Sequence, residues 1–343
     1  MRKLSNTLYV TSPNRYLSLN GENVVILEEN DVVARVPLHN LEEIITFGYT
    51  GASPILMGTC ASKNISLCFL SSSGKFLARV TGKVYGNVLL RKKQYQVSLD
   101  LDESNNIARN FIIGKVYNSK WVIERAIRDY IYILDSEKLK RKSEYLSNSL
   151  KEIRKSNSLD ELRGLEGQAS STYFSVFDDL ILQQKEDFYF NGRNRRPPTD
   201  RVNAMLSFTY TLLANMCASA LETVGLDPYV GFLHRDRPGR ISLALDLMEE
   251  FRSALADRFV ITLINKKIIK PNDFIIKENG AVIFTEDGLK KFLSAWQNKK
   301  QETITHPFLK EKIEWGLLPY AQALLLARYL RGDLDEYPPF MWK

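Results

Sequence analysis

One short segment of the sequence combines a histidine with a dense group of positive charges. The chain has 3 histidines among 343 residues, and one of them, His234, lies in the segment "GFLHRDRPGR". The same segment contains three arginines: Arg235, Arg237 and Arg240. An imidazole can bind a divalent metal ion or act as a general base, and guanidinium groups bind phosphate oxygens in pairs. The segment therefore has the side chains of a site for a phosphate ester, although its arginines could also form a surface loop that pairs with Asp236 and nearby glutamates.

Acidic residues follow this histidine at a spacing that suits a shared site. In "SLALDLMEEFRSALADRF" apolar residues cover one broad side of a predicted helix, and Asp246, Glu249 and Glu250 gather on the other. For an isolated helix, a solvated acidic face is the simpler interpretation, because like charges so spaced repel each other. Asp246 and Glu249, however, come only 12 and 15 residues after His234, across a turn with glycine and proline. Either acid is therefore a candidate partner of the histidine.

A third acid, Glu166, lies on the apolar face of another predicted helix. In "LDELRGLEGQASSTYFSVFDDL" apolar residues recur at steps of three and four, and Glu166 falls within their arc, next to Leu162 and Leu165. A carboxylate on a buried face requires a cation, a metal ion or strong hydrogen-bond donors. The alternatives are that Arg163 or a lysine elsewhere neutralises it, or that it lies at the edge of the core.

These residues together form an oxygen–nitrogen–oxygen set of possible metal ligands: Glu166, His234 and either Asp246 or Glu249. Such a set suits Mg²⁺ or Mn²⁺ with waters completing an octahedron, whereas zinc prefers more nitrogen or sulfur. We expect the three side chains to converge in the folded chain. His234 could instead be a general base. Ligation is favoured because no second acid lies close in sequence to orient a free imidazole.

The elements that must position these residues fall into two parts. Residues 1–98 contain short β-branched runs and the hairpin signal Asn20-Gly21, which predict a mainly β domain. The acidic, polar residues 99–106 are predicted to be a linker. Residues 107–343 show helical periodicity, so the sequence predicts an α+β protein with a larger, all-α C-terminal domain. This domain contains all the candidate catalytic residues named above.

A basic loop and a long apolar helix stand out in the helical part. The segment "RNRRPP" contains Arg193, Arg195 and Arg196 and must be non-helical at its prolines, so it is predicted to be an exposed basic loop. A helix is predicted over residues 202–223, with Gly225 as its C-cap. Residues spaced by four make a polar stripe along it, which argues against a lipid-facing helix.

The overall charge and the cysteines narrow the class of protein. The net charge of +7 favours a polyanionic partner without requiring one. The 3 cysteines lie in apolar surroundings and form no zinc-binding set, which is typical of buried thiols in a reducing compartment. No signal peptide or membrane span is predicted, and we expect a cytoplasmic protein.

Three segments of the helical part carry distinctive motifs in a fixed order: "GLEGQAS", "RPPTDRVNAMLSFTYTLLANMC" and "GFLHRDRPGRISLALDLMEEFR". They resemble a known family, the CRISPR adaptation integrases, which are the larger of the two proteins that insert new spacers into a CRISPR array. The resemblance implies metal ligands at Glu166, His234 and Glu249. Family members often have aspartate at the third position, and Asp246 also matches an acidic position of the motif. The third ligand therefore stays open between these two acids.

The same resemblance implies a reaction and partners. The reaction is attack by the 3′-hydroxyl of a captured DNA fragment on a phosphodiester of the repeat, and water in place of the hydroxyl gives a metal-dependent DNA endonuclease. Duplex or branched DNA would be held by the two basic segments. The family forms homodimers through the β domain and binds a small ferredoxin-like protein in a heterohexamer-type complex. Two alternatives remain: a non-catalytic nucleic-acid-binding protein, and a metal-dependent phosphohydrolase that acts on nucleotides.

Overall fold

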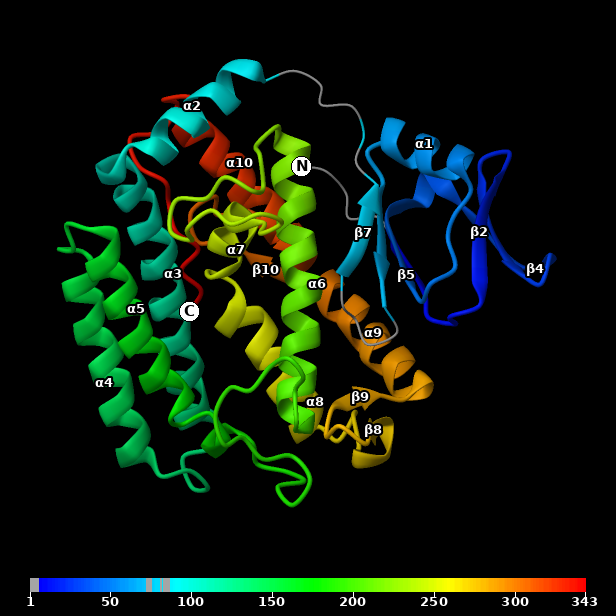
Figure 1. The fold of residues 1–343 in the computed structure, drawn as a ribbon. Coiled ribbons are helices and arrows are strands. Elements are labelled where there is room, and N and C mark those ends of the chain that lie inside the picture. The colour runs from blue at the N-terminus through cyan, green and yellow to red at the C-terminus, as the bar shows by residue number, and fades with distance from the viewer. Residues whose placement is uncertain (1–5, 72–75, 81, 83–86) are drawn as a thin grey trace. The chain divides into compact units, whose positions relative to one another are not determined.

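The protein forms two compact units (Figure 1). The structure is a computed structural model that describes residues 6–71, 76–80, 82 and 87–343. The first unit contains Met1–Tyr85, Asn272–Ile275 and Ile283–Gln301. The second contains Gly86–Pro271, Ile276–Val282 and Glu302–Lys343. The predicted α+β class is confirmed, because strands dominate the described part of the first unit and helices the second.

Two small sheets build the first unit. Its elements are β1 (Asn6–Val10), β2 (Arg15–Asn20), β3 (Asn23–Glu28), β4 (Asp31–Pro37), a 3₁₀ turn (Leu38–Asn40), β5 (Leu41–Phe47), α1 (Pro54–Ser62), β6 (Ser66–Leu70), β7 (Phe76–Val80) and α9 (Glu286–Gln301). Strands β1, β5 and β6 are parallel and β7 is antiparallel to β6, while β2, β3 and β4 form an antiparallel sheet. Gly21, with a φ of 58°, turns the chain between β2 and β3, which confirms the predicted hairpin.

Helices make up most of the second unit. They are α2 (Val88–Leu99), α3 (Leu101–Asp129), α4 (Ser136–Ile153), α5 (Leu159–Phe174), α6 (Arg201–Val224), α7 (Ser242–Met248), a π-helix (Arg252–Asp257), α8 (Arg258–Asn265) and α10 (Leu318–Leu330), with 3₁₀ turns at Asp178–Leu180 and Trp315–Leu317. The short strands β10 (Thr303–Thr305) and β11 (Lys312–Glu314) pair with each other. A 3₁₀ turn (Pro271–Asp273) and the paired strands β8 (Phe274–Ile276) and β9 (Val282–Phe284) contain residues of both units. Helices α3, α4 and α5 pack together, and α6 packs against α7 and α10.

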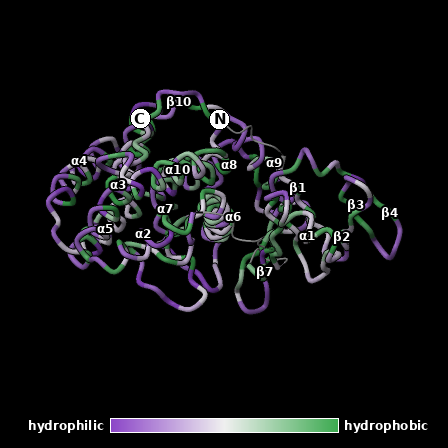
Figure 2. Tube along the Cα trace, turned by 90° about the horizontal axis from the view of Figure 1, so that it is seen from above, coloured by the Kyte–Doolittle hydropathy of each residue, from purple (hydrophilic) through white to green (hydrophobic). Residues whose placement is uncertain are grey.

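Helix α6 is the central apolar helix of this unit. It ends at Gly225, whose φ of 85° confirms the predicted C-cap. Figure 2 shows α6 nearly end-on beside α7. The helix is long and apolar enough to cross a membrane, but most of it is buried within the unit. Its apolar residues therefore pack against the neighbouring helices.

The predicted linker at residues 99–106 is wrong. Helix α2 ends at Leu99, and Asp100 accepts hydrogen bonds from the backbone N–H groups of Asp102 and Glu103, so it caps α3. Acids are favourable in the first turn of a helix, because the helix dipole places positive charge there. The acidic stretch thus marks a helix start. The boundary between the units lies instead between residues 85 and 86. Residues 272–275 and 283–301, which were predicted to be part of the all-α domain 107–343, belong to the first unit.

The chain between α7 and α8 is irregular where one continuous helix was predicted. Helix α7 ends at Met248, a turn covers residues 249–251, and the π-helix follows. Asp246, Glu249 and Glu250 are all buried, so the interpretation of a solvated acidic face is wrong. A π-helical segment is frequent at functional sites, because its wider turn redirects side chains that an α-helix would place elsewhere.

Candidate active site

Asp246 fixes the turn that carries the histidine. Its Oδ2 accepts hydrogen bonds from the backbone N–H groups of Phe232, at 2.7 Å, and Leu233, at 3.0 Å. Its Oδ1 accepts from the backbone N–H of His234 at 3.0 Å and lies 2.5 Å from Nδ1 of the same residue. The close approach requires glycine at position 231, since a Cβ there would lie 2.7 Å from Oδ2 of Asp246.

These contacts decide what Asp246 can do. Each of its two oxygens already has two donors, which uses the acceptor capacity of a carboxylate. Asp246 is therefore an anchor for the histidine turn, and Glu249 is the better candidate for the third metal ligand. The expectation that no nearby acid orients the imidazole is also wrong. Asp246 holds Nδ1, as carboxylates commonly do for metal-binding histidines, and this leaves Nε2 of His234 as the available donor atom.

A lysine on α3 joins the two glutamates. The ammonium of Lys115 contacts Oε1 of Glu166, from α5, and lies 2.8 Å from Oε2 of Glu249. Ser170, one turn further along α5, donates a hydrogen bond to the same Oε1 of Glu166 at 2.8 Å. The side chain of Glu166 is 27% exposed and that of Glu249 only 5%. Glu166 thus lies at the edge of the core, and a lysine from elsewhere in the chain neutralises it, which was one of the alternatives.

Arg163, the other candidate for neutralising Glu166, has a different role. Its Nε and Nη2 donate to the carbonyl oxygen of Leu233, at 3.1 and 2.7 Å, and its Nη1 pairs with Asp160. Arg163 therefore supports the histidine turn from α5, in addition to the anchor that Asp246 provides from α7.

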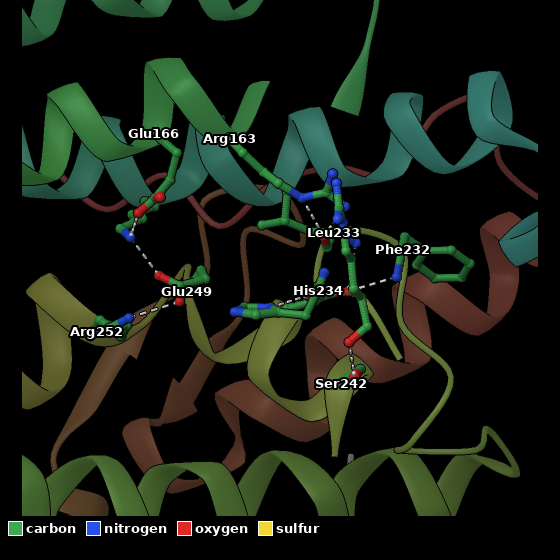
Figure 3. Close-up of polar contacts among 11 residues, drawn as sticks. Arg163, Glu166, Phe232, Leu233, His234, Ser242, Glu249 and Arg252 are labelled. Carbon is green, nitrogen blue, oxygen red and sulfur yellow. Dashed lines mark hydrogen bonds and ion pairs between the residues drawn. The ribbon is translucent and has the colours of Figure 1, made fainter. Parts of the chain in front are cut away.

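Glu249 lies between two cations and stays ionised. Its Oε1 is 2.8 Å from Nη1 of Arg252, the first residue of the π-helix. Burial raises the pKa of Glu249, but the charges of Arg252, Lys115 and His234 outweigh burial and lower that pKa to about 2. In Figure 3 the side chain of Glu166 points toward Glu249, and the imidazole of His234 extends toward Glu249 from the other direction. That these three residues share one metal ion stays a prediction.

The donor set suits a divalent cation. Among the described residues, no three His, Cys, Asp or Glu side chains already form a metal-binding group. The two glutamates nevertheless meet at one cation, the ammonium of Lys115, and the free nitrogen of the imidazole lies on the side of Glu249. Two carboxylates and one imidazole fit Mg²⁺ or Mn²⁺. In this structure the ammonium of Lys115 bridges the two glutamates, which are the candidate carboxylate ligands.

A cavity of about 270 Å³ lies beside Glu166 and carries several cations. Lys115, Arg193, Arg195 and Arg252 line it together with Ser119 and Ser170. Arg193 is held there by Asn203, whose Oδ1 is 2.5 Å from its Nη1, and its guanidinium lies over the ring of Tyr210. Glu166 and Asp257 also line the cavity, so four cationic side chains face two acids there, and this balance favours an anionic ligand such as a phosphate group.

Comparison with known proteins gives the family. The family described as CRISPR associated protein Cas1 matches residues 8–298 of this chain. A protein of Chlorobaculum tepidum named CRISPR-associated endonuclease Cas1 1 is 48% identical over 343 residues, which are 100% of both chains. The chain belongs to the Cas1 family.

Solved structures have the same fold as this member of the Cas1 family. A casposase bound to integration product is 25% identical, with a TM-score of 0.82 over 98% of this chain and 93% of that chain. A Cas6-RT-Cas1–Cas2 complex is 21% identical, with a TM-score of 0.82 over 100% of this chain and 36% of that chain. The resemblance seen in the sequence is confirmed, and with it the predicted class of enzyme, a CRISPR-associated endonuclease and integrase. The two alternatives, a non-catalytic binder and a nucleotide phosphohydrolase, are not favoured.

The arginines predicted to bind DNA in this Cas1 family member differ in their surroundings. Arg195 and Arg196 are exposed, as expected for the basic loop, but Arg193 is partly buried against α6. In the histidine turn, Arg235 is exposed and pairs with Asp160 at 3.2 Å. Arg237 is exposed and Arg240 is half-buried, and neither forms an ion pair within the described residues. The predicted pairing of this loop with Asp236 is likewise absent from that part of the chain.

Two residues of the site were not predicted from the sequence: Lys115 and Arg252. Lys115 lies in "FIIGKVYNSK", where apolar residues surround it on the helix, so it carried the same signal as Glu166. Arg252 lies three residues after Glu249, a spacing that favours ion pairs on a helix. Both signals were present, but the sequence does not show which buried charge meets which.

Proposed function

We propose that this chain inserts new spacer DNA into a CRISPR array by attack of a 3′-hydroxyl on a repeat phosphodiester. We propose further that Glu166, His234 and Glu249 hold the divalent ion, Mg²⁺ or Mn²⁺, that this reaction uses. Membership of the Cas1 family and the 48% identity to a CRISPR-associated endonuclease support the proposal. The observation that carries it is that two carboxylates meet at Lys115, with the imidazole of His234 extending toward one of them, beside a cavity lined by guanidinium groups.

Each residue of the site has a role in this reaction that follows from its contacts. A bound divalent ion would lower the pKa of the attacking hydroxyl and stabilise negative charge on the phosphorane-like transition state. Asp246 keeps the imidazole of His234 in one orientation and one tautomer. Arg252 fixes one oxygen of Glu249 and keeps that carboxylate ionised, so that its other oxygen is available to a cation.

The cationic side chains would bind the DNA backbone. Arg193 and Arg195 line the cavity beside Glu166, where they can contact the phosphates that flank the reacting bond. Arg235, Arg237 and Arg240 extend from the turn that carries His234, so they would hold the strand next to the site. This placement answers why a histidine lies among so many arginines: one turn supplies both a metal ligand and contacts to phosphate.

We propose the partners of the family for this chain as well. These are a homodimer through the first unit and a small ferredoxin-like protein in a heterohexamer-type assembly. The solved Cas6-RT-Cas1–Cas2 complex, which contains a chain of this fold, supports a second protein of the adaptation system as partner.

The cytoplasm is the compartment we propose, since the 3 cysteines are buried and unpaired, as in a reducing environment.

An integration assay tests the proposal. The protein is mixed with a duplex that ends in 3′-hydroxyls and with a plasmid that carries a repeat, in Mn²⁺ or Mg²⁺, with and without the small partner. We expect joined products that require the metal ion and the 3′-hydroxyl and that disappear with a chelator. DNA binding without any cleavage or joining would favour the non-catalytic alternative, and hydrolysis of free nucleotides would favour the phosphohydrolase.

A further inference from the structure

We infer that Lys115 is the built-in counter-ion of the metal site and leaves its place between Glu166 and Glu249 when a divalent ion binds. The inference rests on the proposed function, because it takes these two glutamates as ligands. It concerns Lys115 itself, which is neither a ligand nor a group that the reaction described above requires.

Lys115 occupies the position that a shared metal ion would need. The ammonium of Lys115 contacts Oε1 of Glu166 and lies 2.8 Å from Oε2 of Glu249, and its side chain is only 10% exposed. A divalent ion bound to the same two oxygens, with ligand bonds of about 2.0–2.6 Å, would need the space that this ammonium fills. Oε1 of Glu166 already accepts from Ser170 as well, so it has no room for two cations. Lysine and metal ion therefore exclude each other.

The neighbouring arginine, Arg252, contacts Glu249 in a different way. Arg252 pairs with the other oxygen of Glu249, Oε1, at 2.8 Å, and its guanidinium also lies over the ring of Tyr210. The group does not occupy the position between the two glutamates. Arg252 can thus stay while Lys115 moves, and only the lysine competes with a metal ion.

The ammonium of Lys115 can move into a neighbouring cavity. Its side chain ends in a compact ammonium on a flexible four-carbon stem, which changes position more easily than the planar fork of an arginine. It lines the cavity of about 270 Å³ that also borders Ser119 and Ser170. A displaced ammonium can enter this space, where hydroxyl groups can accept its hydrogen bonds and a DNA phosphate would attract it.

The arrangement solves a folding problem of metal sites. Two carboxylates that converge without a cation repel each other and raise the free energy of the folded chain. Lys115 removes this repulsion before any metal ion is bound. The cost is weaker metal binding, since each divalent ion must displace an ammonium that is already paired.

The variant Lys115→Met tests the inference, because methionine keeps most of the length of the side chain and removes its charge. Mn²⁺ binding is measured by electron paramagnetic resonance, and thermal melting is followed with and without Mn²⁺. We expect the metal-free variant to melt several degrees lower than the wild type and Mn²⁺ to bind roughly tenfold or more tighter. The added ion should also raise the melting temperature of the variant more than that of the wild type. Lys151→Met, which removes an exposed charge on α4, should change neither quantity.

Two outcomes would overturn the inference, and they differ in what they say about the metal site. If Glu166→Gln abolishes Mn²⁺ binding and Lys115→Met binds Mn²⁺ no tighter than the wild type, the metal site stands and the role of Lys115 is wrong. If Glu166→Gln binds Mn²⁺ as the wild type does, the proposed ligand set fails, and the inference fails with it.

A structure of the wild type with Mn²⁺ bound gives an independent test that does not depend on the folding of a variant. We expect Nζ of Lys115 to have left at least one of the two glutamates. An ammonium that still contacts both Glu166 and Glu249 beside a bound ion would refute the displacement.

Discussion

Replacing Glu166 with glutamine is expected to reduce catalysis strongly and the free energy of unfolding only slightly. If Glu166 only paired with a buried cation, the glutamine would be expected to cost about 3–5 kcal/mol, because the cation would be left without a partner. The structure changes this expectation. Lys115 keeps Oε2 of Glu249 at 2.8 Å, and Ser170 can still donate to the amide oxygen of the glutamine.

The magnitude follows from exposure and from the remaining partner. The side chain of Glu166 is 27% exposed, so its attraction to Lys115 is partly screened by water. We therefore expect Glu166→Gln to lower the free energy of unfolding by only about 1 kcal/mol, which corresponds to a decrease of roughly 2–4 °C in melting temperature for a unit of this size. Loss of a metal ligand should reduce DNA cleavage and integration by more than the roughly 10–100-fold expected for a residue that only supports a ligand.

Two measurements on one preparation decide the matter: a thermal melt and an integration assay in Mn²⁺. Glu152→Gln, an exposed glutamate on α4, serves as the control and should match the wild type in both. DNA affinity should hold in both variants, since it depends on arginines. A Glu166→Gln protein that melts much lower yet cleaves DNA at the rate of the wild type would show that Glu166 is only the partner of Lys115, and the catalytic assignment would be refuted.

Three further variants are expected to differ from the wild type in stability, in the pH dependence of stability and in DNA binding, respectively. The carboxylate of Asp246 accepts from four donors, and Asp246→Asn would place an N–H donor among them. We therefore expect the free energy of unfolding to fall by about 3 kcal/mol and the protein to be inactive. Denaturant unfolding and the integration assay measure these two effects. Burial raises the pKa of Glu250 from 4.5 to about 8, so the folded state binds the extra proton and this group costs stability increasingly as pH rises from about 4.5 to about 8. Glu250→Gln should remove that dependence, and a melting temperature that varies with pH as in the wild type would contradict the assignment. Replacing Arg235, Arg237 and Arg240 together with glutamine should weaken DNA binding. The slope of the logarithm of the binding constant against the logarithm of the salt concentration should become less steep by about 0.9 for each phosphate that the turn no longer neutralises. An affinity equal to that of the wild type at every salt concentration would show that this turn does not touch DNA.

The candidate ligands could be predicted from the sequence because each is anomalous where it stands. Glu166 falls on an apolar arc, and His234 lies among arginines just before a group of acids. Periodicity of the apolar residues is enough to detect such exceptions. The family resemblance then assigned the roles, including the preference for Glu249 that the hydrogen bonds of Asp246 now support.

The partners of these residues could not be predicted, for a physical reason. Lys115 lies 51 residues before Glu166 in the sequence, and α3 is apolar around so much of its circumference that one lysine points to no particular neighbour. Glu249 and Glu250 show the same limit. Adjacent in sequence and chemically identical, they have pKa values of about 2 and about 8. Burial raises the pKa of both, but nearby cations outweigh it at Glu249, whereas at Glu250 the hydrogen bonds from uncharged groups offset only part of it. Tertiary contacts alone make that difference.

The domain boundary was missed for another reason. An acidic, polar stretch at residues 99–106 has the composition of a linker, and the same composition favours the start of a helix. Asp100 decides between the two through its capping hydrogen bonds. A linker and a helix start can thus have the same composition, and only the hydrogen bonds that the acidic residues accept distinguish them.

The long-range contacts of Glu250 also set the order in which the site can mature while the chain is being made. This residue, the neighbour of Glu249, accepts hydrogen bonds from Gln322 and from the backbone of Phe340, which follow it by 72 and 90 residues. Asn118 likewise donates to the carbonyl oxygens of Glu250 and Phe340. At common rates of translation, about 90 residues take roughly 5–20 s to synthesise. During that interval a nascent chain already contains all three proposed metal ligands but lacks the residues that hold the acidic segment in place, so its ability to cut DNA should arise late in its own synthesis.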